Sequence, residues 1–349
     1  MSEFQVPIRP AVRNLPRYRP GKAAPGAMKL SSNEMATPPS APILEAMRKA
    51  LENVNRYPDL MATPVREAIA KRFKVFPEQV CVGTGSSALL LAALSAVCSP
   101  GAKVVYPWRS FESYPIAIPA SHAEGVPVPL DEDGGHDVEG LVCAAQDATA
   151  LILCSPNNPT GPVLAFDTIR EIVERVPASV LVLVDEAYID FASDPRVSSA
   201  IPLIEEHPNV LVLRTFSKVH ALAGVRVGYA IGNTELIGAI QAVSVPFGVS
   251  SVAQAAALAS LEDEAGVRAS AQAVIAERER MIAALREAGL SVPDSQANFF
   301  FLRGLGADFV DACVDAGLIV RPFPEGVRVT LADPLTNDRF LEVARRFAR

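Results

Sequence analysis

Residues 150–186 read ALILCSPNNPTGPVLAFDTIREIVERVPASVLVLVDE, and they join two short apolar runs through a segment with helical spacing. Each apolar run has the length of a strand that is buried on both faces. The segment FDTIREIVERV between them repeats its apolar residues at the spacing of a helix. A strand, a helix and a second strand in this order predict a βαβ unit with parallel strands.

The same alternation extends in both directions along the chain. The further runs that we interpret as buried strands are VCVG, KVVYP, GVPVPL, VLVLRTF and VGYAIG. Helical segments such as ALLLAALSAV separate them. This pattern predicts an α/β fold whose mostly parallel, seven-stranded sheet carries helices on both faces.

The domain organisation follows from changes in composition. A chain of 349 residues exceeds what one hydrophobic core usually serves, so we expect two lobes. Residues 1–31, rich in proline and basic residues, predict an extended arm that packs on the small domain or on a partner subunit. Residues 32–241 hold the alternating pattern and predict the large domain. Residues 242–349, with a long alanine-rich helical pattern and then short apolar runs, predict a smaller α+β domain.

Composition excludes several classes of function. The formal net charge of −7 provides no basic face, which argues against nucleic-acid binding and favours a ligand of metabolite size. The five cysteines are scattered and the four histidines show no metal-ligand spacing, so we expect a reducing, cytoplasmic setting and no metal. The longest apolar run is too short to span a bilayer, and no secretion signal is expected.

The segment VCVGTGSSALLL, residues 80–91, predicts an anion site at a strand end. Gly83 and Gly85 leave the strand, and Ser86 and Ser87 open a helix whose free N–H groups could receive a phosphate. The same letters match G-x-G-x-x-A, but the acid that a dinucleotide site requires after the next strand is missing from AKVVYPWRSF. A plain strand-to-helix turn capped by serine remains the alternative.

Three other strands end in polar residues. One leads into Asn157 and Asn158, where N-P-T-G could also be an ordinary turn. Another ends at Asp185 and is soon followed by Tyr188, and its acid could be a helix N-cap. The third delivers Lys218, which taken alone would be a surface lysine. Open α/β sheets bind ligands beyond the carboxyl ends of their strands, and together these groups suit pyridoxal 5'-phosphate, which needs a lysine, a carboxylate and a phosphate site.

The segments NNPTG, DEAY and RTFSKVHALAGVRVGY, in this order, resemble the fold-type I pyridoxal-phosphate-dependent aminotransferases. The resemblance is to the histidinol-phosphate and aromatic branch and covers nearly the whole chain. Within that branch, WRSFESYP, VPFGVSS and SQANFFFL are similar to the actinobacterial aromatic (phenylalanine) aminotransferases. The resemblance implies the type I transferase fold and a homodimer whose active site is shared between subunits.

The resemblance also implies roles for individual residues. Lys218 would form the Schiff base with the cofactor and move the substrate proton, Asp185 would pair with the pyridine nitrogen, and Tyr188 would hold the 3'-oxygen. The other implied cofactor contacts are Gly85, Ser86, Ser87, Phe111, Asn158, Thr215, Ser217 and Arg226, with Tyr57 reaching the phosphate from the neighbouring subunit. The implied substrate contacts are Arg328, Asn157, Arg321 and Tyr18. His220, where relatives usually carry an aromatic residue, is expected to pack behind Lys218.

The expected function is transamination between an aromatic amino acid (Phe, Tyr or Trp) and 2-oxoglutarate. Histidinol phosphate is the chief alternative donor, because the basic arm could bind its phosphate. The same arm could equally cover the ring of an aromatic amino acid. A nicotinamide-dependent oxidoreductase and a non-enzymatic regulator on the same fold are the alternatives from other classes.

Overall fold

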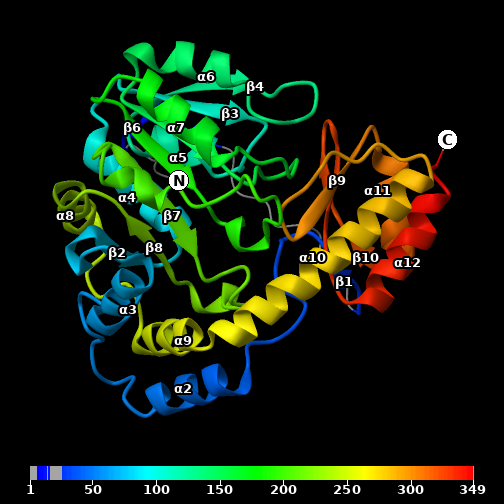
Figure 1. The fold of residues 1–349 in the computed structure, drawn as a ribbon, viewed down its shortest axis with the longest axis horizontal. Coiled ribbons are helices and arrows are strands. Elements are labelled where there is room, and N and C mark those ends of the chain that lie inside the picture. The colour runs from blue at the N-terminus through cyan, green and yellow to red at the C-terminus, as the bar shows by residue number, and fades with distance from the viewer. Residues whose placement is uncertain (1–5, 14, 16–25, 349) are drawn as a thin grey trace, which may run out of the picture.

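The structure is a computed structural model that describes residues 6–13, 15 and 26–348. Its larger lobe is built on a seven-stranded sheet, and its smaller lobe lies at the far end of a long helix (Figure 1). The strands of the large sheet follow one another in the order β2 (Val80–Gly83), β8 (Gly228–Ile231), β7 (Val210–Thr215), β6 (Leu181–Asp185), β5 (Ala150–Cys154), β3 (Lys103–Trp108) and β4 (Glu124–Pro129). Only β8 runs against its neighbours, so the predicted mostly parallel, seven-stranded sheet is confirmed.

Helices cover both faces of this sheet, as the uninterrupted apolar strands predict. In β5, Leu151 and Leu153 face one buried core, while Ala150 and Ile152 face the other. The helices that pack in the first core are α2 (Ala41–Leu51), α3 (Thr63–Phe73), α6 (Val138–Ala144), α7 (Phe166–Arg175) and α9 (Ser251–Glu262). Those in the second are α4 (Ser86–Val97), α5 (Tyr114–Ala120) and α8 (Thr234–Val243).

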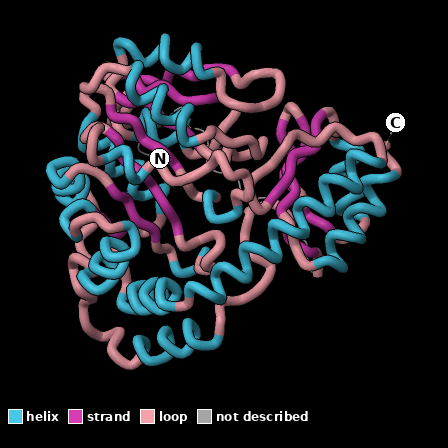
Figure 2. The backbone as a smooth tube through the Cα atoms, viewed as in Figure 1, coloured by secondary structure: helices cyan, strands magenta, loops and turns pink. Residues whose placement is uncertain are grey.

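The smaller lobe has its own sheet (Figure 2). It also has its own hydrophobic core. Its antiparallel strands are β11 (Arg321–Phe323), β12 (Gly326–Thr330) and β9 (Phe299–Arg303). The helices of this lobe are α10 (Glu264–Glu287), α11 (Ala307–Asp315) and α12 (Pro334–Arg345). The short strand β1 (Met28–Lys29) pairs in parallel with β10 (Leu318–Ile319), so the end of the arm joins this lobe.

The remaining described elements are short. They are the helix α1 (Pro10–Arg13) and the 3-10 helices η1 (Pro77–Gln79), η2 (Ala145–Asp147), η3 (Ile189–Phe191), η4 (Ile201–Ile204) and η5 (Ala223–Val225). Among the described residues, no helix combines the length and the hydrophobicity that a bilayer crossing would need.

The predicted domain boundary between residues 241 and 242 remains a proposal, and the position of α9 favours a later boundary. This helix lies beyond residue 242, yet Ala253, Ala256 and Ala257 are buried in the first core of the large lobe. Asp263 then ends α9 and caps α10 by accepting a hydrogen bond from the Gly266 amide at 3.2 Å. We therefore propose that the change from the large to the small lobe falls within α10.

Candidate active site

A cavity of about 320 Å³ opens at the carboxyl ends of β5, β6 and β7, beside the N-terminus of α4. Most of the predicted site residues line it: Ser86, Ser87, Phe111, Asn158, Asp185, Tyr188, Thr215, Ser217, Lys218, Arg226 and Arg328. Arg328 comes from the small lobe, so the cavity lies where the two lobes meet. Chain order alone could not show this convergence, but the rule for parallel strand ends predicts it.

Lys218 follows β7 and faces the cavity. Its Nζ donates hydrogen bonds to the carbonyl oxygens of Ser32, at 3.3 Å, and Asn33, at 3.2 Å. Burial, and after it the positive charge of Arg328, lower the pKa of this amine to about 7. A large fraction of the amine is therefore neutral, and nucleophilic, near neutral pH.

Asp185 ends β6 and is buried at the bottom of the site. Its Oδ2 accepts a hydrogen bond from the Tyr114 hydroxyl at 2.9 Å, and its Oδ1 accepts one from the Ala187 amide at 3.2 Å. Burial raises the pKa of this carboxyl, and these hydrogen bonds oppose the rise. Within the described residues Asp185 forms no ion pair, so the site offers a buried acid suited to a cationic group of a ligand.

The predicted anion site requires glycine at position 85, because the guanidinium of Arg226 lies close to the backbone there. Gly85, with φ +97°, precedes α4, and a Cβ atom there would lie 2.6 Å from the guanidinium of Arg226. Arg226 donates to Ser217 Oγ at 3.1 Å, which joins the cation to the strand end that carries Lys218. No side chain caps α4. The helix N-terminus, Arg226 and the serine hydroxyls thus form a site for a phosphate.

Arg328, on β12, forms the opposite wall of the cavity. Its guanidinium donates to Asn158 Oδ1 and to the carbonyl oxygen of Ser31, and it lies over the ring of Phe299. The Tyr188 hydroxyl accepts a hydrogen bond from Asn33 Nδ2 at 2.9 Å, and burial raises the pKa of that phenol. An arginine at this position can bind a carboxylate through two hydrogen bonds.

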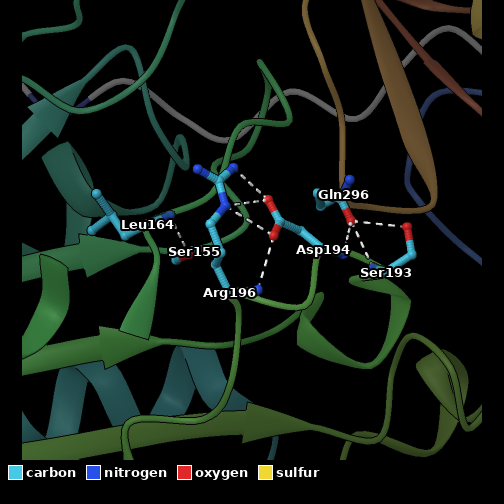
Figure 3. Close-up of polar contacts among 6 residues, drawn as sticks. All are labelled: Ser155, Leu164, Ser193, Asp194, Arg196 and Gln296. Atoms are coloured by element: carbon cyan, nitrogen blue, oxygen red, sulfur yellow. Dashed lines mark hydrogen bonds and ion pairs between the residues drawn. The ribbon is translucent and has the colours of Figure 1, made fainter. Parts of the chain in front are cut away.

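Other predicted residues do not line the cavity. The Asn157 side chain is held by its own loop and by the segment after β3: Nδ2 donates to Thr160 Oγ1 at 2.8 Å, and Oδ1 accepts from Ser110 Oγ at 2.6 Å. The Ser155 hydroxyl, which accepts from the Leu164 amide at 2.9 Å, closes this loop (Figure 3). We propose that Asn157 shapes the loop and that Asn158 alone faces the ligand.

The remaining predicted residues lie around the cavity or away from it. Gly85 contributes through its contact with Arg226, and Arg321 forms an ion pair with Glu112, a cavity residue. Tyr57 is 83% exposed in this single chain, and its ring lies 4.7 Å from that of Phe247. Tyr18 lies outside the described residues.

His220 is buried, as its apolar neighbours predict, and is not among the residues lining the cavity. Its Nδ1 lies 2.7 Å from Ser260 Oγ, and its ring lies 4.7 Å from that of Phe216. Burial lowers its pKa to about 4, so it is neutral at physiological pH.

Several cavity residues were not predicted from the sequence. They are Ser32, Asn33, Glu34, Glu112, Cys154, Ala187 and Ala223. Tyr114 was not predicted either; it does not line the cavity but donates a hydrogen bond to Asp185. The only signal was position: SSNE begins where the arm ends, and Tyr114 shares RSFESY with Phe111.

The Gln296 side chain joins the two lobes outside the cavity. Its Oε1 accepts hydrogen bonds from the Ser193 and Asp194 amides at 2.7 and 3.2 Å (Figure 3). This contact fixes the segment before β9 against the loop after η3, and so helps to hold the small-lobe sheet in place beside the site.

The donor set fits pyridoxal 5'-phosphate. A lysine amine of lowered pKa suits the aldehyde, the buried Asp185 suits a protonated pyridine nitrogen, and the α4 N-terminus with Arg226 suits the phosphate. All three groups line one cavity, so a single ligand can meet them together.

Comparisons with known proteins agree with this geometry. Residues 25–346 match the family model described as aminotransferase class I and II. An aromatic amino acid aminotransferase of Streptomyces avermitilis is 44% identical and covers 100% of this chain and 99% of its own length. One of Rhodococcus erythropolis is 45% identical, with 97% and 95% covered. The histidinol-phosphate aminotransferase of Sinorhizobium meliloti, solved in complex with pyridoxal-5'-phosphate, superposes with a TM-score of 0.88 at 26% identity, over 99% of this chain and 100% of its own.

Proposed function

The chain belongs to the class I and II aminotransferases, and from this premise we propose that it transfers the amino group of an aromatic amino acid to 2-oxoglutarate. It is a pyridoxal-phosphate-dependent transaminase, so the open question is its substrate. The observation that carries the aromatic assignment is that relatives named aromatic amino acid aminotransferases match 96–100% of the chain at 42–45% identity.

The cofactor, when bound, supplies an electron-withdrawing ring that makes the Cα proton of an amino acid acidic. Lys218 would hold the cofactor through its amine, and the same amine, which its lowered pKa leaves largely neutral, would serve as the base for the Cα proton. Asp185 would supply the negative charge that keeps the ring nitrogen of the cofactor protonated. Tyr188 and Asn158 line the same cavity and would hold the ring oxygen.

Binding and orientation fall to the arginines at the two ends of the cavity. Arg226, with Ser86, Ser87 and Ser217, holds the phosphate. Arg328 holds the substrate carboxylate, and its hydrogen bond to Asn158 keeps the guanidinium oriented. With its carboxylate held by Arg328, the substrate would present its Cα to Lys218, which lines the same cavity, as proton transfer requires.

A second chain completes the site in this proposal. Tyr57 is largely exposed, and its ring contacts that of Phe247. Leu60, Leu91 and Val245 are also exposed, and they border an apolar hollow of about 420 Å³. An apolar surface of this kind is typical of an interface between subunits. We therefore propose a homodimer in which Tyr57 reaches the partner's phosphate site. A cytoplasmic location, where the five free cysteines would stay reduced, belongs to the same proposal.

The substrate assignment is tested by comparing kcat/KM for phenylalanine, tyrosine and L-histidinol phosphate as donors to 2-oxoglutarate. We expect the aromatic amino acids to be preferred, and a preference for the phosphorylated donor would assign the enzyme to histidine biosynthesis instead. Lys218→Ala is expected to abolish transamination, while Lys71→Ala, on the exposed face of α3, serves as the matched control.

A further inference from the structure

Asn33, at the end of the arm, is buried and lines the cavity. Its Nδ2 donates a hydrogen bond to the Tyr188 hydroxyl at 2.9 Å. Its backbone amide donates to Thr330 Oγ1 at 2.9 Å, and its Oδ1 accepts from the same hydroxyl at 3.0 Å. Its carbonyl oxygen accepts from Lys218 Nζ and from Asn298 Nδ2, each at 3.2 Å. A hydrogen bond therefore fixes every polar atom of Asn33.

The two hydrogen bonds to Thr330 decide which end of the Asn33 amide faces Tyr188. The Thr330 oxygen accepts the backbone N–H, so its own proton is donated to Oδ1, and the amide nitrogen is left for the phenol. An amide nitrogen can only donate. The backbone of Asn33 has a φ of 55°, in the left-handed region that asparagine and aspartate adopt more readily than most residues with a Cβ. The fold thus presents a donor to the Tyr188 oxygen.

The Tyr188 phenol has one proton, and this geometry leaves it for a ligand. Because the phenol oxygen accepts from Asn33, its own proton points elsewhere. Among the described residues, no protein group accepts that proton, and the Tyr188 side chain lines the cavity. Burial raises the pKa of the phenol, so the proton is present at neutral pH.

Asn158, the second donor proposed for the ring oxygen, is oriented in the same way. The Arg328 guanidinium can only donate, and it donates to Asn158 Oδ1. The amide nitrogen of Asn158 is thereby left as a donor, and Asn158 lines the same cavity. The cavity therefore holds two donors, each oriented by a neighbouring group that itself only donates.

We propose that Asn33 is a positioning residue that directs the proton of Tyr188 into the cavity, where it is donated to the ring oxygen of the cofactor. This inference rests on the proposed function, in which Tyr188 holds that oxygen, and adds the residue that orients the phenol. Donation to the ring oxygen stabilises its negative charge and weakens its hold on a proton. Asn33 acts through the phenol, so its side chain should affect the cofactor only while residue 188 carries a hydroxyl.

Asn33→Asp tests the direction of this hydrogen bond. Aspartate has nearly the same shape, suits the left-handed backbone and can still accept from Thr330, but the oxygen that faces Tyr188 would accept the phenolic proton. We expect the Kd of pyridoxal phosphate, measured on the apo-protein by equilibrium dialysis, to rise about tenfold, as in Tyr188→Phe. Asn53→Asp, at an exposed position after α2, is the control for the change from amide to acid and should leave the Kd unchanged.

The absorption of the bound cofactor gives a second readout. The pH midpoint of its visible absorption change should rise by about one unit in Tyr188→Phe and in Asn33→Asp, because the ring oxygen loses a donor in both variants. Asn33→Gly adds no charge and suits the φ of 55°. It should raise the Kd by about threefold and shift the midpoint in the same direction.

Double variants separate this role from a purely structural one. Combined with Tyr188→Phe, neither Asn33→Asp nor Asn33→Gly should raise the Kd by more than about twofold beyond Tyr188→Phe alone, because no phenol remains to be oriented. Equal losses with and without the Tyr188 hydroxyl would overturn the inference and leave the proposed function standing. If Tyr188→Phe changes neither the Kd nor the midpoint, the proposed role of Tyr188 fails and this inference fails with it. Both readouts work without an amino donor, so they are independent of the aromatic assignment.

Discussion

The hydroxyl of Tyr114 donates a hydrogen bond to Oδ2 of Asp185 at 2.9 Å, and both side chains are buried. The carboxylate lies in surroundings that raise its pKa, so its negative charge depends on the donors around it. Among the described residues, the Tyr114 hydroxyl and the Ala187 amide donate to that carboxylate, and Tyr114 does not itself line the cavity. It is therefore a positioning residue, which acts on the cofactor through Asp185.

Tyr114→Phe should weaken cofactor binding by about tenfold, because a hydrogen bond to a charged group contributes on the order of 1.5 kcal/mol. The dissociation constant of pyridoxal phosphate, measured by equilibrium dialysis, checks this. Tyr106→Phe is the control, since Tyr106 is also largely buried and its ring lies 6.4 Å from that of Tyr114. Equal affinities in both variants would show that Asp185 does not depend on the phenol.

Gly228→Ala should damage the phosphate site and the fold together. A Cβ atom at this position would lie 2.7 Å from the Ser86 amide nitrogen and 2.8 Å from the Arg214 carbonyl oxygen. Both are backbone atoms, so β8 would have to move away from the start of α4. We expect a loss of about 2 kcal/mol in the free energy of unfolding in urea, with weaker cofactor retention.

Gly224→Ala is the matched control for that change. No atom lies within 4 Å of a Cβ at Gly224, and we expect stability to stay the same or rise slightly, because alanine restricts the unfolded chain. A Gly228→Ala protein as stable as Gly224→Ala would mean that the close approach of β8 to α4 is not required.

The sequence predicted the cavity well because of a property of parallel sheets. Their carboxyl ends share one edge, so residues after β5, β6 and β7 converge whatever separates them along the chain. This rule alone places Asp185 and Lys218 at the same edge of the sheet. The apolar strands also predicted helices on both faces, since strands without a polar alternation must be covered twice.

The same reasoning could not predict contacts that depend on tertiary packing. Asn157 and Asn158 are adjacent and chemically identical, and only the loop conformation decides that the second one faces the cavity. Arg321 and Glu112 are separated by 209 positions and meet because of how the lobes pack. Tyr57 illustrates a third limit, because its proposed role requires a second chain.

The two buried histidines should make the protein sensitive to acid. Burial lowers the pKa of His136 and of His220 to about 4, whereas an unfolded histidine titrates near pH 6.5. Below that pH the unfolded chain binds protons that the folded chain cannot, so stability falls between pH 6.5 and 4. At pH 5 each histidine should lower the free energy of unfolding by roughly 2 kcal/mol relative to pH 7.5.

His220→Gln tests this cost, because glutamine does not titrate and can keep a hydrogen bond to Ser260. Its unfolding free energy should fall less than that of the native protein between pH 7.5 and pH 5, as measured in urea. His207→Gln, at a partly exposed position, controls for the loss of any histidine. The same pH dependence in all three proteins would contradict the assignment of a neutral, buried His220.

The reactivity of Lys218 should follow its lowered pKa. The neutral amine is the nucleophile, and at pH 7 a pKa of about 7 leaves roughly half of it neutral, against about one part in three thousand for an ordinary lysine. Attachment of pyridoxal phosphate to the apo-protein should therefore accelerate with pH and level off above about pH 7. The readout is the rate of borohydride-trapped modification of Lys218, with Nα-acetyl-lysine run in parallel to correct for titration of the reagent.

The charge of Arg328 provides an internal check on that profile. Burial is the first cause of the lowered pKa and the Arg328 guanidinium is the second, so Arg328→Gln makes protonation of Lys218 easier and raises its pKa. The midpoint of the profile should move to higher pH, whereas Arg345→Gln, exposed at the end of α12, should leave it in place. A native midpoint near pH 10, or no difference between the two variants, would show that the cavity does not set the charge of Lys218.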